Sequence, residues 1–562
     1  MLLPQVKVLP ILSLLFLSLG LLDILEKKVT STRYTSFIST TSKGITKQKI
    51  NSSSRTIATA TATSATINVS NNYESSESKS DNNIVILGGG FGGLNAALTL
   101  DSLPWDEHER PNIILVDKKE RFVFLPLLYE LCVGDAELEE VAPTFKSLLK
   151  NTNNIQFLQR NIQGIDKDNQ QIYLTNKQQE HQSPTECIPY KSLIIATGAD
   201  INLSSIPGTK EYALPFYTVE DCYELRKRLS LLDELIKSQI RQKLSSSKDD
   251  NDISFKVVIV GGGYSGVELA LNLKERLNYS NLLKRDDKKN SDINVNIEIS
   301  ILHRANEVLQ YATDYNRVNG QQRLKDANIE LLTKRSVVEV LPPAEQNDLL
   351  DDNSTNGWKG RCRIIASVKG DEQQHNDTLE TIDADLLLWT AGAMSKNEPR
   401  GILNSKLPRD ANGRIVTNQY LQVKDETNVF ALGDCARVKR IPHGATAAVA
   451  MQQAPVVAWN AFSSMNQEDN KIKNLKNVKL DLLPFDYLNL GEMMTLGGDD
   501  ATIAGPSRLF QLDGSVASIA RRLIYAVRMP TLQQALTAAK SSTSKRLEKS
   551  SLEKVEKVIN WK

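Results

Sequence analysis

The sequence predicts an α/β fold with two parallel-sheet domains and an amphipathic helical segment near the C-terminus. In 83–93 an apolar run typical of a buried strand leads into a glycine-rich turn, and the same arrangement returns in 256–266. In 515–540 apolar residues recur at steps of three and four, as on one face of a helix. A strand, a Gly-x-Gly-x-x-Gly turn and a helix in this order are typical of dinucleotide binding, so we expect two Rossmann-like domains.

Composition limits the classes of function. The chain has 562 residues, which is enough for two or three domains with large cores. Its formal net charge of +1 argues against a nucleic-acid partner. The five cysteines stand far apart and form no Cys-x-x-Cys, so we expect neither a disulfide framework nor a metal site. Such cysteine usage is typical of a reducing compartment.

Residues 1–81 have a different composition from the rest of the chain. Leu9 to Ile24 is strongly apolar, whereas 27–73 contains no Asp or Glu and is rich in Ser and Thr. An apolar stretch followed by an acid-poor, hydroxyl-rich one is similar to the bipartite presequence of algae with complex plastids. We therefore expect a targeting presequence and a disordered linker, and a plastid location at the thylakoid or plastoglobule. The alternatives are a mitochondrial inner-membrane location, or an N-terminal anchor, although the apolar run is shorter than the ~20 residues of a membrane span.

The first glycine-rich turn has the residues that a dinucleotide cradle needs. Its first glycine allows the tight turn, the second lets the backbone approach a pyrophosphate, and the third lets the helix pack close to the strand. The N-terminus of that helix then faces the anion. Asp117 ends the next apolar strand, where it can bind ribose hydroxyls or, alternatively, cap the strand. The candidate cofactor-binding residues of this half are Gly88, Gly90, Phe91, Gly93, Asp117 and Lys118.

Three later strands end in small or acidic residues that suit the same ligands. The run 193–199 ends in Thr-Gly-Ala, and 385–392 ends in Thr-Ala-Gly, so the backbone can come close to a bound dinucleotide. The run 428–434 ends in Gly-Asp, which offers a carboxylate to the ribityl chain of a flavin. The candidates here are Thr197, Gly198, Gly392, Gly433 and Asp434. Two dinucleotides in one chain are usually a flavin and a nicotinamide, so we expect transfer of hydride or electrons between them.

The second glycine-rich turn supplies Gly261, Gly263 and Gly266, with Glu268 just beyond. The next apolar strand, 299–302, is followed by His303 and Arg304 in place of an acid. Without an acid there is no repulsion against a 2′-phosphate, and Arg304 can pair with one. The alternative is that His303 and Arg304 are simply solvated.

Taken together, these motifs resemble the type II NAD(P)H:quinone oxidoreductases. The resemblance covers about 82–531 and includes Thr390-Ala391-Gly392, Gly433-Asp434 and Gln452-Gln453 in the family's order. Three stretches, 122–131, 490–497 and 520–525, narrow it to the plastid-type alternative NAD(P)H dehydrogenases of plants, algae and cyanobacteria.

The resemblance implies an enzyme that passes two electrons from NAD(P)H through FAD to a membrane quinone, either plastoquinone, another prenylquinone or ubiquinone. It also implies that Gln452 and Gln453 border the quinone beside the flavin, and it makes a homodimer possible. We expect protons to reach the quinone either through water or through Glu268. One departure from the family pattern is Ala448, which stands where the quinone helix usually has Gln and puts one polar quinone contact in doubt.

The expected organisation follows from these positions. The presequence and linker occupy 1–81, the first part of the FAD domain 82–220, a charged linker helix 221–253, and the NAD(P)H domain 254–393. The second part of the FAD domain, with the quinone-site helix, occupies 394–484, and a membrane-associating region 485–562.

The C-terminal helical segment is both apolar and basic. Its apolar positions include Ile519, Leu523, Ile524 and Val527, and Arg521, Arg522 and Arg528 lie between them. A basic amphipathic helix of this kind can lie on a membrane surface, with the apolar residues inserted and the arginines near head-groups. The alternative is an ordinary helix that docks on the enzyme's own core.

Three other functions compete with this interpretation. A disulfide reductase of the same fold needs two neighbouring cysteines in its first domain, where Cys132 stands alone. A single-cysteine NAD(P)H oxidase or peroxidase would need Cys132 to be exposed and its thiol to have a low pKa. Cys132 instead follows an apolar stretch. A flavoprotein with a mainly signalling role would lack turnover.

Overall fold

The computed structural model describes most of the chain after residue 81. The described ranges are 82–152, 154–175, 186–245, 252–278, 294–344, 361–370, 377–395, 407–439, 442–467, 480–506 and 510–530. The predicted presequence, 1–81, and residues 531–540 of the expected C-terminal helix lie outside these ranges.

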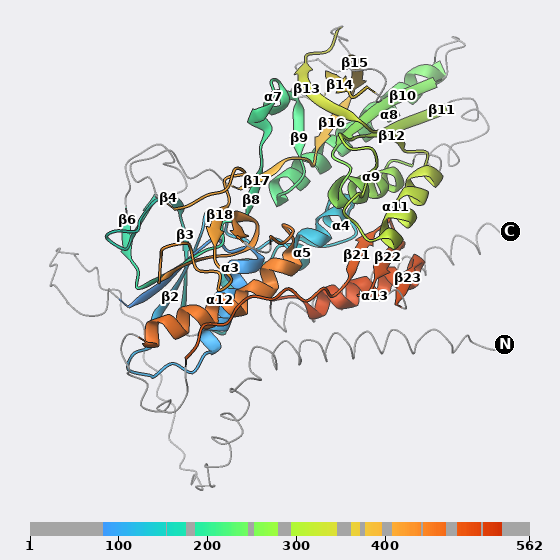
Figure 1. Ribbon diagram of the computed structural model, residues 1–562. Helices are drawn as coiled ribbons and strands as arrows, with labels where there is room; N and C mark the ends of the chain where they lie inside the picture. Colours follow the sequence, from blue (N-terminus) through green and yellow to red (C-terminus); the bar gives the residue numbers. More distant parts are fainter. Residues whose placement is uncertain are drawn as a thin grey trace, which may run out of the picture.

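A five-stranded parallel sheet forms the core of the first half of the molecule (Figure 1). Its order is β19 (Val429–Ala431), β7 (Ser192–Ile195), β1 (Asn83–Leu87), β2 (Asn112–Asp117) and β3 (Ile155–Gln159). All five residues of β1 are buried, because β1 lies in the middle and pairs in parallel with β2 and β7. A strand covered on both faces is expected to be a continuous apolar run, as β1 is from Ile84 to Leu87.

Successive residues of β1 face two different layers. Ile84 and Ile86 belong to the core beneath the helices α3 (Phe91–Ser102) and α12 (Ala447–Gln467). Val85 and Leu87 belong to the core on the opposite face, beneath an antiparallel sheet. That sheet consists of β4 (Asn161–Asp166), β5 (Gln171–Thr175) and β6 (Glu186–Pro189). The half is therefore a three-layer structure with helices on one face only.

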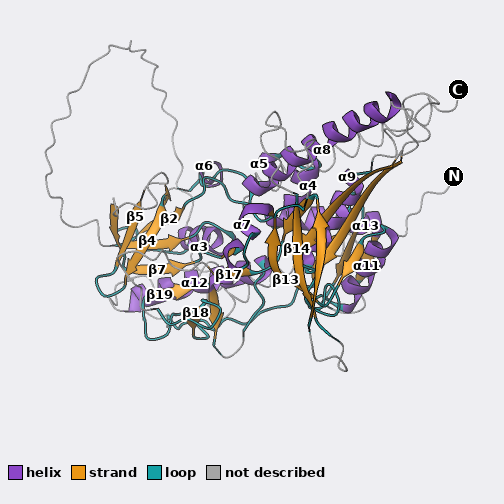
Figure 2. Ribbon diagram, turned by 90° about the horizontal axis from the view of Figure 1, so that it is seen from above, coloured by secondary structure: helices purple, strands orange, loops and turns teal. Residues whose placement is uncertain are grey.

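The second half repeats this plan. Its parallel sheet has the order β12 (Glu330–Leu332), β11 (Asn294–Leu302), β10 (Asp252–Val260), β16 (Leu386–Trp389) and β9 (Ala213–Pro215). Helices α9 (Tyr264–Arg276) and α11 (Asp314–Asp326) accompany this sheet. The antiparallel sheet of this half is β13 (Arg335–Leu341), β14 (Cys362–Val368) and β15 (Thr378–Ala384). Figure 2 shows the two sheet systems at opposite ends of the molecule.

Two contacts tie the halves together where sequence analysis drew a boundary. Strand β9 falls within 82–220, the range expected for the first domain, but it pairs with β16 at the edge of the second sheet. Strands β8 (Ala199–Ile201) and β17 (Ala393–Ser395) pair antiparallel as the chain enters and leaves the second half. The chain thus crosses between the halves through paired strands.

The expected linker helix is α8 (Val219–Ser245), which follows β9 directly. One side of it is apolar and buried at steps of three and four: Cys222, Leu225, Leu229, Leu232 and Ile236. The short helix α4 (Leu128–Val133) packs against α8 and against α9. α4 therefore belongs to the first half in sequence but lies in the interface with the second.

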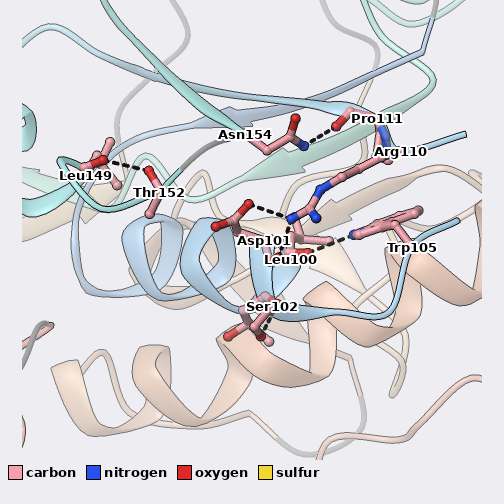
Figure 3. A network of polar contacts seen from close by, with 10 residues as sticks. Leu100, Asp101, Ser102, Trp105, Arg110, Pro111, Leu149, Thr152 and Asn154 are labelled. Carbon is pink, nitrogen blue, oxygen red and sulfur yellow. Dashed lines mark hydrogen bonds and ion pairs between the residues drawn. The ribbon is translucent and has the colours of Figure 1, made fainter. Parts of the chain in front are cut away.

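The loop between α3 and β2 is held by a polar network (Figure 3). The Trp105 indole donates to the Leu100 carbonyl at 2.8 Å, and Arg110 pairs with Asp101 at 2.8 Å. Asn154, just before β3, donates to the Pro111 carbonyl at 2.6 Å. These contacts fix the return of the chain into the first sheet.

The C-terminal region contains a sheet that the sequence analysis did not predict. Strands β21 (Glu492–Thr495), β22 (Ala501–Ala504) and β23 (Gln511–Asp513) form an antiparallel meander, followed by helix α13 (Gly514–Val527). Ala501 and Ile503 of β22 pack with Ala517, Ala520 and Ile524 of α13. α11 also contacts β21 and β22. The region is thus a folded unit packed on the second half.

The orientation of α13 corrects the expected membrane face. Ile524 is buried against the meander, and Arg521 is only 1% exposed, so neither residue can insert into or approach a lipid surface. Arg521 and Arg522 both pair with Glu130 of α4. A buried arginine needs such a partner, which is why this basic side of the helix faces the protein. We call the remaining apolar side the outer stripe; it consists of Val516, Ile519, Leu523 and Val527.

Among the described helices, none is long and apolar enough to cross a bilayer.

Candidate functional site

Of the three motif glycines in the first turn, Gly88 and Gly93 are tightly packed and Gly90 faces open space. Gly88 has φ +99°, and a Cβ there would lie 2.4 Å from the Ala196 carbonyl oxygen. A Cβ on Gly93 would lie 1.8 Å from the Gly88 carbonyl oxygen. A Cβ on Gly90 would meet nothing within 4 Å. The outer glycines are therefore required by the fold, whereas Gly90 borders the space where a pyrophosphate could approach the start of α3.

The second turn has the same geometry. Gly261 has φ +121°, with Thr390 Oγ1 only 2.5 Å from a would-be Cβ, and a Cβ on Gly266 would lie 1.8 Å from the Gly261 carbonyl oxygen. Gly263 faces open space. Two stretches far apart in the sequence thus fold into similar cradles, one at the end of β1 and one at the end of β10.

Asp117 ties the end of β2 to the first turn. Its carboxylate accepts the Gly89 N–H at 2.6 Å and the Lys119 N–H at 2.8 Å. The strand-end cap considered from the sequence is therefore present. Each carboxylate oxygen keeps a second lone-pair direction, so the cap leaves Asp117 able to accept from a ribose hydroxyl. Lys118 follows it and is exposed.

In the second cradle His303 occupies the place that Asp117 has in the first. The Gly262 N–H donates to His303 Nδ1 at 3.1 Å, as the Gly89 N–H does to Asp117. Arg304 then corresponds to Lys118, and it is exposed. The sequence alone identified the missing acid but did not show which of the two residues takes its position.

The His303 imidazole is held in one tautomer. Nδ1 accepts a hydrogen bond, so the ring is neutral with its proton on Nε2. Burial, together with the Arg304 charge, lowers the pKa of His303 and favours this form. Within the described part of the chain Nε2 is buried and makes no hydrogen bond of regular geometry, although the Glu307 backbone acts on the ring and favours its protonation. The second cradle therefore carries an N–H donor that a bound nucleotide could satisfy.

The strands that close the cradles carry glycines in the left-handed conformation. Gly198 has φ +68° and Gly392 has φ +74°, and a Cβ on either would meet nothing within 4 Å. Thr197 beside Gly198 is half-buried, and Thr390 donates through Oγ1 to the Val260 carbonyl at 3.0 Å. Both loops thus present backbone to the space next to their turn. The ring of Phe91, a predicted cofactor-binding residue, packs edge-on against Phe122, with the ring centroids 5.1 Å apart.

Asp434 lies at the end of β19, next to the first cradle's closing strand β7. Burial raises the pKa of this carboxyl. Within the described residues no hydrogen bond or ion pair satisfies it. The Asp434 side chain is half-buried, so its carboxylate can accept a hydroxyl of a bound ligand, and this half fits a flavin with a ribityl chain.

Gln452 and Gln453 of α12 are both buried and bind backbone. Gln453 Oε1 accepts the Gly433 N–H at 2.7 Å, which fixes the turn before Asp434. Gln452 exchanges two hydrogen bonds with the backbone of Leu488, at 2.9 and 3.0 Å. The two side chains therefore hold the Gly433 turn and the segment around Leu488 against α12.

Glu268 lies on α9, two residues past the second cradle, and its side chain is nearly buried. Its Oε1 accepts the Thr495 N–H of β21 at 2.9 Å. Burial raises the pKa of Glu268 to about 7, although the Thr495 N–H, the Arg521 charge and the Tyr129 hydroxyl act in the opposite direction. A carboxyl that titrates near neutrality is suited to exchange protons.

The cysteine chemistry of the rival functions does not fit Cys132. The thiol is 3% exposed and lies beside Cys222 of α8. The contact with Cys222 and burial raise its pKa well above the ordinary value. A peroxidatic cysteine needs an accessible thiolate, so Cys132 is a buried structural thiol.

The sequence analysis missed Tyr129 and Glu130, which border Glu268 from α4. The signal was present: Glu130 is a single acid in the apolar stretch 122–131, and the arginines 521 and 522 interrupt another apolar pattern. Charged residues at buried positions have to pair, but sequence does not say with which partner.

Comparisons with known proteins agree with this geometry. The family model described as pyridine nucleotide-disulphide oxidoreductase matches 82–454. The chain is 34% identical over 459 residues to the demethylphylloquinone reductase of a Synechocystis strain, covering 81% of this chain and 94% of that protein. It is 35% identical over 464 residues to an alternative NAD(P)H-ubiquinone oxidoreductase of Arabidopsis thaliana named chloroplastic/mitochondrial, covering 80% and 78%.

Solved structures share the fold. The structure of NDH2 from Plasmodium falciparum in complex with NADH has a TM-score of 0.62 at 18% identity and covers 82% of this chain and 97% of that one. The sulfide:quinone oxidoreductase of Aquifex aeolicus has a TM-score of 0.55, also at 18% identity, with coverage of 80% and 92%.

The two open glycines give a matched pair of substitutions. Gly90→Ala and Gly263→Ala are expected to keep the fold, because both residues have ordinary negative φ and nothing within 4 Å of the new Cβ. Gly90→Ala should lose bound flavin, since the methyl group enters the space over the first turn. Gly263→Ala should keep flavin and lose nucleotide affinity. Flavin released by acid precipitation, nucleotide titration and far-UV circular dichroism measure the three properties.

Gly93→Ala is the control for the fold itself, because its Cβ would collide with backbone. If Gly263→Ala lost the flavin instead, the assignment of the two cradles would be reversed.

Proposed function

The chain belongs to the pyridine nucleotide-disulphide oxidoreductases and, among them, to the type II NAD(P)H:quinone oxidoreductases, and from this premise we propose how its residues divide the reaction. The enzyme is a flavoprotein that uses FAD and NAD(P)H and transfers electrons to a quinone. NAD(P)H, one proton and quinone become NAD(P)⁺ and quinol. When bound, FAD supplies the two-electron redox chemistry that amino-acid side chains lack. The observation that carries the proposal is the pair of cradles, each with two tight glycines around an open one.

The first cradle would hold FAD. Gly90 and the start of α3 would face the pyrophosphate, and Asp117, with Lys118 beside it, would meet the adenosine ribose. Asp434 would bind the ribityl chain, and Thr197, Gly198 and Gly433 would bring backbone close to it. The unsatisfied Asp434 carboxylate and the open space over Gly90 support this assignment.

The second cradle would hold NAD(P)H. Gly261, Gly263, Gly266 and Gly392 form its walls, and the His303 and Arg304 pair would select a 2′-phosphate. The support is that His303 replaces an acid and offers an N–H donor, while Arg304 adds a positive charge next to it. A ribose 2′-phosphate has oxygens that can accept both.

Glu268 would exchange protons during quinone reduction, which consumes them. The glutamines Gln452 and Gln453 would shape the quinone side of the flavin by holding the Leu488 segment and the Gly433 turn in place. This role is compatible with Ala448, because the backbone-binding glutamines do not depend on a polar side chain at 448.

We further propose a plastid prenylquinone as the acceptor and a plastid membrane as the location. The relatives' names include a cyanobacterial demethylphylloquinone reductase and a chloroplastic/mitochondrial enzyme, and the acid-poor presequence supports the plastid. Assays of NADPH and NADH with decyl-plastoquinone, a short naphthoquinone and decyl-ubiquinone test this. Absence of turnover with every quinone would favour a signalling flavoprotein, and a strict preference for ubiquinone would favour the mitochondrial inner membrane. A homodimer stays a prediction, tested by light scattering.

The enzyme would contact its membrane through the outer stripe of α13. Long-chain quinone resides in lipid, so its site has to open toward a lipid surface. Figure 1 shows α12, which carries the two glutamines, and α13 along the same edge of the molecule. The outer stripe is apolar and includes Ile519, which is 40% exposed.

Asp434→Ala should lower FAD occupancy sharply, because the ribityl chain would lose its carboxylate partner. Asp434→Asn should retain more FAD, since an amide oxygen still accepts a hydrogen bond. Flavin released by acid precipitation and identified as FAD or FMN is the measurement. Recovery of FMN, or flavin that stays on the pellet, would contradict non-covalent FAD.

Substitutions in the second cradle should change nucleotide preference. Arg304→Glu should raise the KM for NADPH about tenfold or more and leave that for NADH nearly unchanged, because a charge-assisted contact is worth roughly 1.5–3 kcal/mol. His303→Asp copies the Asp117 cap and should favour NADH by repelling the 2′-phosphate. Initial rates with both nucleotides measure the effect. Equal changes for NADPH and NADH would mean that neither residue meets the phosphate.

Membrane contact is tested on the outer stripe rather than by removing α13, because truncation would unpair the buried Glu130. Ile519→Glu should weaken binding to liposomes about tenfold or more, since burial of one large aliphatic side chain is worth roughly 1.5–3 kcal/mol. Reduction of ferricyanide by NADPH should persist. Val318→Glu, on α11 and 60% exposed, is the matched control and should leave flotation unchanged. Full flotation of Ile519→Glu would place the membrane contact elsewhere.

A further inference from the structure

Four charged side chains, three of them buried, lie where three segments of the chain meet. Glu130 comes from α4, Glu268 from α9, and Arg521 and Arg522 from α13. Arg521 pairs with Glu130 Oε1, and Arg522 Nη2 lies 2.9 Å from Glu130 Oε2. With both acids ionised the cluster is electrically balanced, so removal of one charge disturbs the rest.

The two arginines differ in what they influence. Arg521 is 1% exposed, its guanidinium lies 5.2 Å from the centroid of the Tyr525 ring, and its charge acts on Glu268 as well as on Glu130. The Arg522 side chain is 12% exposed and pairs with Glu130. The part of the buried positive charge that affects Glu268 is therefore that of Arg521.

Every element packed around Glu268 contributes a polar or charged neighbour. β21 provides the Thr495 N–H, which binds the carboxylate directly. The other groups that face Glu268 are Tyr129 and Glu130 from α4, Tyr264 from α9, and Arg521 and Tyr525 from α13. Arg521 is the one cation in this set, and Glu130 is the one other carboxylate.

We propose that Arg521 is a positioning residue of the reaction, which from the C-terminal helix pairs with the buried carboxylate of Glu130 and so keeps Glu268 able to release and take up a proton. The inference rests on the proposed role of Glu268. It gives α13 a function in the reaction centre in addition to any contact with a membrane. The guanidinium suits this place because it can pair with Glu130 and lie over Tyr525 while its charge remains fixed.

The direction of each effect follows from the charges. Without Arg521, Glu268 loses the cation that acts on it and Glu130 keeps only Arg522 as a partner, so the protonated form of Glu268 is favoured and its pKa rises. Without the charge of Glu130, Arg521 favours the ionised form, so the pKa of Glu268 falls. Because quinone reduction consumes protons, the protonated form is the active one, and kcat should decline at pH values above this pKa.

The pH dependence of kcat with decyl-plastoquinone tests the proposal on the purified holoenzyme. On the alkaline side of the profile kcat declines, and we call this decline the alkaline limb. Arg521→Met should move the alkaline limb to higher pH by about one unit or more, the size expected for loss of a nearby opposite charge. Glu130→Gln should move it downward. Arg522→Met is the matched control: it also removes a partner of Glu130, but its limb should stay within a few tenths of a unit of wild type. Glu268→Gln should abolish the limb.

Two further measurements keep the outcomes distinct. If Arg521→Met does not fold, the double variant Arg521→Met with Glu130→Gln is compared with Glu130→Gln alone. The alkaline limb of the double variant should lie at the higher pH. Bound FAD and ferricyanide reduction verify the fold of each variant. Failure of wild-type enzyme to reduce any quinone would refute the proposed function itself. With turnover intact, an unchanged limb in Arg521→Met, or an equal shift in Arg522→Met, would overturn the role of Arg521, and a limb that survives in Glu268→Gln would overturn the whole inference.

Discussion

The structure depends on the burial of Arg521 against Glu130. Removing an ion from water costs several kcal/mol even after relaxation, so each of these side chains requires the other. Glu130 lies on α4 in the first half, and Arg521 lies on the last described helix, with the second half between them in sequence. Their pairing therefore seats the C-terminal unit where the two halves meet, and it brings β21 to the position from which the Thr495 N–H binds Glu268.

The two halves reach the same local solution from different residues. In both, a parallel strand ends in a turn whose outer glycines touch backbone or a neighbouring threonine, and the middle glycine stays open. In both, the next strand ends in a side chain that accepts an N–H from the turn, which is Asp117 in one case and His303 in the other. This difference is a chemical one: a carboxylate repels a 2′-phosphate and a neutral imidazole can donate to it. Similar backbone turns thus carry a carboxylate in one cradle and an imidazole in the other.

The glycine-rich turns could be predicted from the sequence because their requirements are local: a φ that only glycine tolerates, or a carbonyl oxygen too close for a Cβ. The edge strand of the second sheet was harder to predict from the sequence, because β9 pairs across the expected domain boundary. The periodicity of 515–540 predicted an amphipathic helix, of which the described residues contain α13, Gly514–Val527. It did not say which side of the helix faces the protein. The side of α13 that faces the protein is set by its contacts with strands β21, β22 and β23 and with Glu130. These partners cannot be read from the periodicity of the helix. In the same way, Gln452 and Gln453 were recognised by motif, whereas their backbone partners Leu488 and Gly433 depend on tertiary packing.

In the proposed reaction, electrons pass from a nucleotide in the second cradle, through a flavin in the first, to a quinone. Anaerobic rapid mixing of the purified enzyme with NADPH, followed by decyl-plastoquinone, tests it directly. We expect NADPH to bleach the flavin absorbance of the wild-type enzyme and the quinone to restore it. In Gly263→Ala the bound flavin should be bleached by NADPH far more slowly. Flavin that remains oxidised in the wild-type enzyme, or reduced flavin that no quinone reoxidises, would contradict it.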